Sequence, residues 1–268
     1  MIPKYLYHYT SLETLQLIIE NNKFRFNRLD QMNDPYEGHN SIFANSRKNV
    51  FSSSWTAEFR DELPMWKMYT DLKGVRLRMP IDLFHHEDKL EVVKMGRMDD
   101  FMIKSNLNHS YKIEVDLSNL PKIKEDNQTF EVKSVYGPSK VDYYETQESL
   151  EKDVVVKNHK ANFDLREINT TILGQRKFDY WSFEKEYRYR IFSAQMMAGS
   201  LDVLTAFEQF AIIKTEYIDV EFRQECLENG EITLGPKSDP GNIALIKDIL
   251  SKKGINNANV QISKIRIQ

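Results

Sequence analysis

The sequence contains few cysteines, glycines and prolines. Its 268 residues include 1 Cys, 10 Gly and 8 Pro, and no stretch is rich in Gly, Ser or Pro in the way that a flexible linker is. The single Cys226 excludes an intramolecular disulfide and a metal site built from several cysteines. Without a linker or an internal repeat, the chain is expected to form one domain over residues 1–268.

Long apolar runs are also missing. No stretch approaches the roughly 18 consecutive apolar residues of a membrane-spanning helix. The first residues, from Met1, lack the apolar core of a signal peptide. A single cysteine fits a reducing compartment. We therefore expect a cytoplasmic protein with no membrane contact.

Neither sign of charge dominates. The 37 Lys and Arg residues face 40 Asp and Glu residues, which gives a formal net charge of -3. A protein that binds nucleic acid mainly through its overall charge needs a strong basic excess. This composition excludes such a binder but leaves a local basic groove open.

Several motifs that carry chemistry are absent. The chain has no Walker loop, no G-x-G-x-x-G, no H-E-x-x-H and no G-x-S-x-G. Its six histidines do not pair with carboxylates at a ligand spacing, so we expect no transition-metal site.

Short alternating strands and amphipathic helices follow one another along the whole chain, which is typical of an α+β fold. The pattern predicts strands at 5–9, 23–26, 49–55, 75–79, 112–117, 130–135, 140–143, 186–192, 217–222 and 259–267, with another ending at Leu234. It predicts helices at 12–21, 63–69, 145–159, 163–173 and 242–253. Around residues 80–170 the pattern is weaker, and we expect a variable, mostly helical insertion there.

Polar side chains gather where the first predicted strand meets the first predicted helix. His8, Tyr9, Thr10 and Ser11 stand at this junction, where side chains can bind a ligand beside the helix N-terminus. The alternative is structural: Thr10 and Ser11 cap the helix, and His8 is an ordinary strand residue.

A second candidate region combines hydroxyls with aromatic rings. Ser52 and Ser53 follow an apolar strand start and can orient a carboxylate or a ribose. Trp66 and Tyr69 lie three residues apart, on one face of a helix, and can form a stacking wall. The alternative is aromatic core packing between helix and sheet.

A third region carries paired carboxylates. Glu184 and Glu186 share one face of an extended segment, and Arg188 and Arg190 continue that face. Two carboxylates this close repel, so the pKa of one rises unless Arg188 or Arg76 pairs with them. The alternative is a ladder of cross-strand ion pairs on a solvated surface.

A polar turn lies between the first two regions. The segment N-D-P-Y-E-G at 33–38 joins side chains that cap turns to a proline with fixed φ. It can be a ligand-binding loop or a structural turn held by Asp34.

The order of these segments resembles a widespread family of uncharacterised bacterial proteins. The shared motifs are Y-x-Y-T, N-D-P-[FY]-E-G, S-x-S, M-W-x-x-Y and W-x-x-E-x-E-x-R, and they cover most of the chain from residue 7 onwards. Members of that family often look like effectors of defence or toxin systems. The resemblance implies a toxin, a toxin–antitoxin component or an antiviral defence effector, with an antitoxin or immunity protein as partner.

The same order resembles, more remotely, the ADP-ribosyltransferase superfamily. The segments H-Y-T at 8–10, S-S-S at 52–54 and E-K-E at 184–186 stand in the order of its three motifs. Ser53 replaces a threonine of the usual middle motif, and Tyr9 replaces a glycine of many relatives. The resemblance implies a split, mixed β-sheet core with peripheral helices.

That resemblance implies an enzyme that consumes NAD and transfers ADP-ribose. Cleavage of the nicotinamide–ribose bond passes through an oxocarbenium-like state, which a nearby carboxylate stabilises. By resemblance, Glu186 holds the ribose 2′-hydroxyl, and Glu184 orients or deprotonates the acceptor. The residues implied for NAD are His8 at the adenosine-side ribose, Thr10 at the nicotinamide region, Tyr9 or Tyr69 stacked on the nicotinamide, and Ser52 and Ser53. Arg76 and Arg188 are expected to contact the substrate.

Other functions stay open at this point. The acceptor can be DNA, RNA, protein or water. One alternative is a module without catalysis that binds a nucleic acid or a protein, through Arg76, Arg78, Arg188 and Arg190. Another is a metal-dependent nuclease, with Asp34, Glu37, Glu184 and Glu186 as magnesium ligands.

Overall fold

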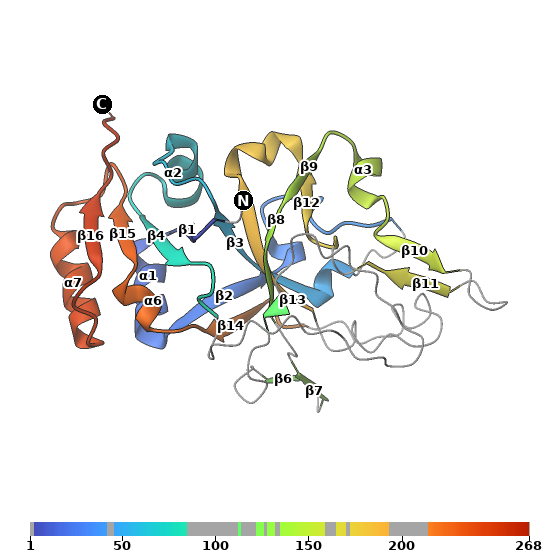
Figure 1. Ribbon diagram of the computed structural model, residues 1–268, viewed down its shortest axis with the longest axis horizontal. Coiled ribbons are helices and arrows are strands. Elements are labelled where there is room, and N and C mark those ends of the chain that lie inside the picture. The colour runs from blue at the N-terminus through green and yellow to red at the C-terminus, as the bar shows by residue number, and fades with distance from the viewer. Residues whose placement is uncertain are drawn as a thin grey trace.

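The computed structural model describes residues 3–41, 46–84, 112–113, 122–125, 128–131, 135–158, 165–169, 172–192 and 214–267. A ten-stranded sheet forms its centre (Figure 1). The strands of the sheet are β1 (Tyr5–Thr10), β2 (Lys23–Arg28), β3 (Val50–Thr56), β4 (Val75–Pro80), β5 (Lys112–Ile113), β8 (Val135–Lys140), β13 (Glu186–Phe192), β14 (Tyr217–Glu221), β15 (Glu231–Leu234) and β16 (Asn259–Ile262). Their order is β16-β15-β4-β1-β3-β13-β8-β5, and β2 links β14 to β3.

Short helices and three small strand pairs surround the sheet. The helices are α1 (Leu12–Asn21), α2 (Leu63–Thr70), α3 (Gln147–Glu151), α6 (Glu225–Glu228) and α7 (Asn242–Lys252), with 3-10 turns η1 (Leu29–Gln31), η2 (Ser46–Asn49) and η3 (Asp179–Glu184). The strand pairs are β6 (Lys122–Glu125) with β7 (Gln128–Glu131), β9 (Asp142–Tyr144) with β12 (Arg176–Phe178), and β10 (Val155–Asn158) with β11 (Leu165–Ile168). Among the residues that the structure describes, no helix is long and apolar enough to cross a membrane.

The predicted α+β class is confirmed. Most strand pairs of the central sheet are antiparallel, while β15 and β16 run parallel, so the sheet is mixed. The predicted elements of the first 80 residues and of 186–192 match the observed ones closely. In the C-terminal segment, the predicted helix at 242–253 matches α7, whereas the strand predicted at 259–267 ends at Ile262 and α6 was not predicted. In α1, Ser11 accepts a hydrogen bond from the Thr14 amide and so caps the helix.

Two helix predictions were wrong. The predicted helix at 145–159 ends as α3 at Glu151, because Asp153 takes a left-handed conformation with φ 60° and a run of β-branched valines then forms β10. The predicted helix at 163–173 contains β11, which pairs with β10. The described part of the expected helical insertion at 80–170 therefore consists mostly of strands, and the rest of that insertion lies outside the described residues.

Two predicted strands of this region also differ from the observed ones. The strand predicted at 130–135 corresponds to two separate strands, β7 and β8. Of the strand predicted at 112–117, only β5 lies in the described part of the chain.

One face of the sheet is apolar and packs on helices. Side chains of β1, β4 and β15 meet α1, α6 and α7 in the largest core cluster, which continues along the sheet through β3 and β13 to β8. Leu6, Leu77 and Ile232 are buried in this cluster. Burial of such apolar area contributes about 25 cal/mol per Å², and this face supplies most of the core.

The other face is polar along β3 and β13. In an antiparallel pair, residues directly opposite one another share a face. Glu186 is opposite Thr56, and Arg188 is opposite Ser54. Tyr7 of β1 is also opposite Thr56, so it lies on this polar face.

The sheet forks at β3. One edge of β3 pairs with β13 over its whole length. The other edge pairs with β1 at Thr56 and with β2 at Phe51 and Ser52. Strands β1 and β2 therefore diverge from the same edge, and the imidazole of His8 contacts the carbonyl oxygen of Ser54 between them at 2.9 Å.

Gly74 allows the close approach of β4 to the end of β1. A Cβ atom at this position would meet the Thr10 carbonyl oxygen and lie 2.7 Å from Thr70 Cβ. We predict that Gly74→Ala lowers the free energy of unfolding by about 1–3 kcal/mol, because the backbone must shift. Urea titration followed by tryptophan fluorescence measures this.

Gly241→Ala is the matched control. A Cβ there would lie 3.2 Å from the flexible Asp239 side chain, with no backbone atom close by. We expect a change within about 0.5 kcal/mol. Equal effects of the two substitutions would contradict the role assigned to Gly74.

Candidate functional site

The paired glutamates lie where η3 passes into β13. Glu184 is the last residue of η3 and Glu186 is the first of β13. Lys185 between them is left-handed, with φ 46°, and its ammonium turns outward to Glu58 and Glu62. The sequence predicted an extended segment at Glu184, but the structure places this residue in η3. Both glutamates nevertheless face inward and are buried.

Lys177 of β12 bridges the two glutamates. Its Nζ lies 2.8 Å from Glu184 Oε2 and 3.0 Å from Glu186 Oε2. The Tyr69 hydroxyl, from α2, donates to the other oxygen of Glu184. The Tyr143 hydroxyl, from β9, accepts the Glu186 amide at 2.9 Å. Residues of β12, α2 and β9 therefore contact the two glutamates, which come from η3 and β13.

Arg188 completes the arrangement from within β13. Its Nε and Nη2 lie 2.7 and 2.9 Å from the two oxygens of Glu186, which is a bidentate ion pair. Its Nη1 donates to the Gly174 carbonyl at 2.7 Å, and its Nη2 also pairs with Glu37. We call Glu37, Lys177, Glu184, Glu186 and Arg188 the buried ion cluster.

Glu37 reaches the cluster because of the turn before it. The Asp34 carboxylate accepts the Tyr36 amide at 2.9 Å, and the Glu37 amide donates to the Asp34 carbonyl at 3.0 Å. This is the structural turn that the sequence offered as one of two interpretations. The turn also aims a carboxylate at Arg188.

Burial dominates the electrostatics of the cluster. It raises the pKa of Glu186 to about 7, with Glu184 adding to the rise while Lys177 and the Ser54 hydroxyl oppose it. Burial also lowers the pKa of Arg188 to about 9, so the guanidinium remains charged at neutral pH. Three carboxylates share two cations here, and this excess of negative charge favours a proton on Glu186.

The tyrosines and the lysine keep their usual protonation. Burial raises the pKa of Tyr69 and of Tyr143 well above the ordinary value, and the neighbouring glutamates add to the rise for Tyr69. Burial alone would lower the pKa of Lys177, but Glu186 and Glu184 outweigh it and raise that pKa. Both hydroxyls are therefore neutral and the ammonium is charged at pH 7.

The structure places His8 and Ser53 away from this cluster, on the apolar face. The His8 ring lies 4.9 Å from that of Trp55 and 5.7 Å from that of Phe24. Ser53 accepts a hydrogen bond from the Trp55 indole at 3.0 Å. Burial lowers the pKa of His8, so the imidazole is neutral at pH 7. Thr10 shares the His8 face because strand side chains alternate.

Tyr5, Tyr7 and Tyr9 are the β1 residues on the Glu186 face. The Tyr9 ring meets Trp66 edge-on at 4.9 Å, which is the core packing offered as the alternative for these aromatics. The Arg76 guanidinium lies 4.5 Å above the Tyr7 ring. Arg76 also approaches Asp61, at 3.9 Å, and does not pair with the glutamates.

Ser52 lies on the polar face, directly opposite Arg190. Arg190 is buried and donates to the Leu173 carbonyl at 2.6 Å. The cation–anion pairs of β13 are thus enclosed, and they do not form the solvated ladder that the sequence offered as an alternative.

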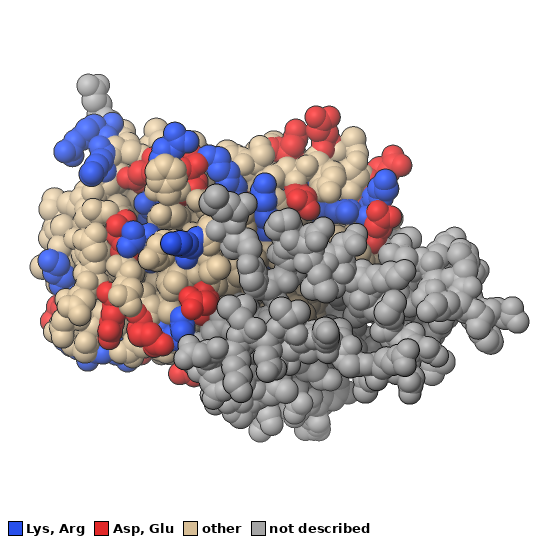
Figure 2. Space-filling view, in the orientation of Figure 1, with Lys and Arg blue, Asp and Glu red and all other residues tan. Residues whose placement is uncertain are grey.

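The arginines predicted for a nucleic-acid groove do not share one surface. Arg76, Arg188 and Arg190 are buried, whereas the Arg78 side chain is 31% exposed and lies beside Glu231. Basic and acidic side chains are interspersed on the described part of the face in Figure 2.

Three of the four carboxylates proposed as magnesium ligands are held by cations of the chain itself, whereas Asp34 accepts the Tyr36 amide. Lys177 lies between Glu184 and Glu186, and Arg188 lies between Glu186 and Glu37. Among the described residues, no group of three or more His, Cys, Asp or Glu is placed to hold a metal ion.

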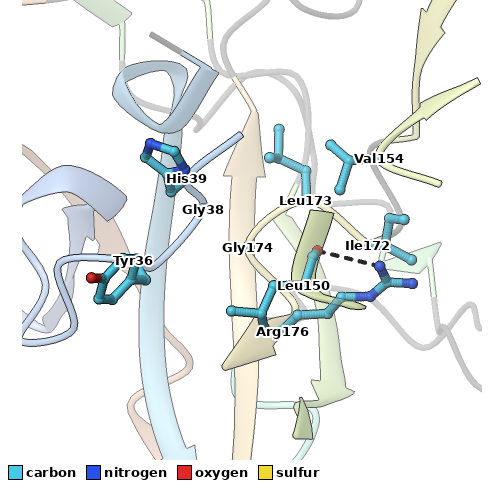
Figure 3. A pocket seen from close by; sticks show the side chains of 9 residues that line it. All are labelled: Tyr36, Gly38, His39, Leu150, Val154, Ile172, Leu173, Gly174 and Arg176. Carbon is cyan, nitrogen blue, oxygen red and sulfur yellow. Dashed lines mark hydrogen bonds between the residues drawn. The ribbon is translucent and has the colours of Figure 1, made fainter. Parts of the chain in front are cut away.

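A small surface pocket lies behind the cluster. It has a volume of about 250 Å³ with its open mouth, and Tyr36, His39, Leu173 and Arg176 are among its lining residues (Figure 3). Gly174 separates it from the cluster, because the Gly174 carbonyl faces Arg188. Glu184 and Glu186 do not line this pocket.

Sequence reasoning missed Lys177 and Tyr143 as site residues. Lys177 stands in a three-residue strand whose pattern carries no helical or alternating signal. Tyr143 lies in the strand predicted at 140–143, but no chemistry pointed to its hydroxyl. Glu37 was considered as a metal ligand and as part of a possible ligand-binding loop, but not as a partner of Arg188.

Comparisons with known proteins give no match. Neither a family model, nor a curated protein, nor a solved structure matches this chain. The interpretation of the site therefore rests on its own geometry and on the resemblance described above.

The raised pKa of Glu186 predicts a pH-dependent stability. The folded state binds a proton more tightly than the unfolded state, so this contribution is present below about pH 4.5 and is lost as pH rises through about 7. We predict that Glu186→Gln removes this component and makes unfolding less pH-dependent between pH 5 and 8. Urea titrations across that range measure it.

Glu231→Gln is the control for this measurement. Glu231 lies in β15 beside Arg78 and takes no part in the cluster. Its substitution is expected to leave the pH dependence between pH 5 and 8 unchanged. If Glu186→Gln behaved in the same way, Glu186 would not be the titrating group.

Proposed function

We propose that this protein is an ADP-ribosyltransferase that consumes NAD, with Glu186 and Glu184 as its catalytic residues. The observation that carries the proposal is the meeting of three distant motifs in the buried ion cluster. Glu37 comes from N-D-P-Y-E-G, Tyr69 from M-W-x-x-Y and the glutamates from E-x-E-x-R.

The buried charges support a functional role more than a stabilising one. Ion pairs in a protein interior are often no more stabilising than apolar residues of the same size. Perturbed pKa values with a specific charged partner cluster at functional sites. A pKa of about 7 for Glu186 and a bidentate partner in Arg188 fit that pattern.

The proposed chemistry uses the carboxylates as electrostatic groups. The bond between nicotinamide and ribose C1′ breaks, nicotinamide leaves with the bonding electrons, and the ribose becomes oxocarbenium-like. In this scheme Glu186 binds the ribose 2′-hydroxyl and stabilises that cation. The acceptor then forms the new bond to C1′, and Glu184 takes the proton that the acceptor loses. Tyr69 or Tyr9 stacks on the nicotinamide.

The sheet geometry supports this scheme and modifies one part of it. The fork of β1 and β2 at β3 is compatible with an ADP-ribosyltransferase-like split sheet. His8 and Thr10 lie on the face of the sheet away from Glu186. We therefore assign the contact between β1 and NAD to Tyr9. Glu186 is 3% exposed, and the proposal therefore requires η3 or α2 to move when NAD binds.

The proposal extends to biology through the family resemblance. We infer that the protein is a toxin or an anti-phage defence effector that modifies a nucleic acid or a protein. A module without catalysis is the second candidate, and the closed state of the cluster favours it.

We predict that the wild-type protein releases nicotinamide from NAD and transfers labelled ADP-ribose to a component of a bacterial extract. Glu186→Gln should lower kcat/KM by about 10²–10³, because it removes the negative charge that stabilises the transition state. Glu184→Gln should lower transfer to the acceptor more than release of nicotinamide. Chromatography of the reaction products and label incorporation measure these two steps.

Glu231→Gln serves as the control, because it removes a carboxylate from the same sheet outside the cluster. It should keep wild-type turnover. No nicotinamide release by the wild type, together with binding of single-stranded nucleic acid that falls steeply with salt, would favour the second candidate.

A further inference from the structure

Lys177 is the residue of β12 that points into the buried ion cluster. In the parallel pair of β12 with β9, Lys177 is level with Tyr143, whose hydroxyl accepts the Glu186 amide. Its neighbour Arg176 turns the other way and donates to the carbonyls of Ser149 and Leu150 in α3. Because side chains alternate along a strand, Lys177 faces the buried ion cluster and Arg176 faces the end of α3.

The ammonium of Lys177 contacts both catalytic carboxylates. It has three N–H donors and no acceptor, and two carboxylate oxygens lie within 3.0 Å, one on Glu184 and one on Glu186. The Trp181 ring centre lies 5.0 Å from Nζ, which adds a cation–π contact. The Lys177 side chain is 6% exposed, so water does not compete for these contacts.

Arg188 does not duplicate this role. Its guanidinium pairs with Glu186 and Glu37, while Glu184 receives its contacts from Lys177 and Tyr69. Among the described residues, Lys177 is the cation that touches both glutamates. Without a cation between them, the neighbouring carboxylates of Glu184 and Glu186 could not both ionise without a large cost in free energy.

We propose that Lys177 is the positioning residue of the Glu184–Glu186 pair: its ammonium favours the ionised form of both carboxylates and aims them at a common point. The catalytic meaning of this role rests on the proposed function. The ion-pair role itself does not depend on it. The charged and titratable groups in or next to the buried ion cluster, besides Lys177, are Glu37 from the turn, Tyr69 from α2, Tyr143 from β9, Glu184 from η3, and Glu186 and Arg188 from β13.

The test compares Lys177→Met, which removes the charge, with Lys177→Arg, which keeps it. In protein labelled with carbon-13 at the glutamate side chains, NMR follows the titration of the carboxyl carbons. We expect Lys177→Met to move the titration of Glu186 to higher pH by about one unit or more, a tenfold or larger change in its protonation equilibrium. We expect Lys177→Arg to remain near the wild type.

A second readout uses the reaction. The acidic limb of the pH profile for nicotinamide release should move to higher pH in Lys177→Met and return towards the wild-type position in Lys177→Arg. A merely structural lysine would lower activity equally at all pH values. Arg176→Met is the matched control, since it removes a cation from the same strand that faces the carbonyls at the end of α3, and it should not move the profile.

The double variant Lys177→Met/Glu184→Gln keeps the test decisive if Lys177→Met does not fold. It removes one positive and one negative charge together, so the Glu186 titration should shift less than in Lys177→Met. Where Lys177→Met cannot be measured, the double variant should still titrate at higher pH than Glu184→Gln alone. An unchanged titration of Glu186 on loss of Lys177 overturns the proposal.

The two proposals fail in different ways. Absence of NAD turnover in the wild type, with the titration shift present, removes the proposed function and keeps Lys177 as the holder of the ion pair. Turnover with no shift in titration or in pH profile removes the role of Lys177 and keeps the proposed function.

Discussion

The bidentate ion pair between Glu186 and Arg188 is the contact on which the rest of the candidate site depends. Both residues lie on β13, two positions apart, so the strand itself places them on one face. Glu186 then reaches Lys177, and Arg188 reaches Glu37 and the Gly174 carbonyl. Loss of one partner leaves a buried charge unpaired, which typically costs about 3–5 kcal/mol. The distant segments that meet here are therefore held as one unit.

The period of two along each strand decides which residues can act together. Glu186 and Tyr7 lie on the polar face because both are opposite Thr56. His8 is the next residue along β1 and lies in the apolar core against Trp55. A shift of one residue in a strand motif thus moves a side chain from the candidate site to the core. The sequence order of the motifs does not contain this information.

Local patterns predicted the fold well where the signal is local. Helix α1 has a capping serine and apolar residues at helical spacing, and both features survive in the structure. The valines after Asp153 were assigned to a helix, although their β-branched side chains favour a strand and β10 pairs with β11, which comes later in the chain. The paired glutamates were recognised from their spacing, whereas Lys177 reaches them only through tertiary contacts.

The contacts of Glu184 and those of Glu186 would respond differently if the site opened. Tyr69 comes from α2, and Lys177 lies next to η3 in the chain, so movement of either cover element stretches the contacts to Glu184 first. Glu186 and Arg188 pair within one strand at the centre of the sheet. This contact therefore does not depend on the position of α2 or η3. In the proposed reaction, Glu186 therefore keeps one cationic partner while the other side of the carboxylate becomes available to a ribose. A site built in this way can open at the cost of a few contacts and still present an oriented carboxylate.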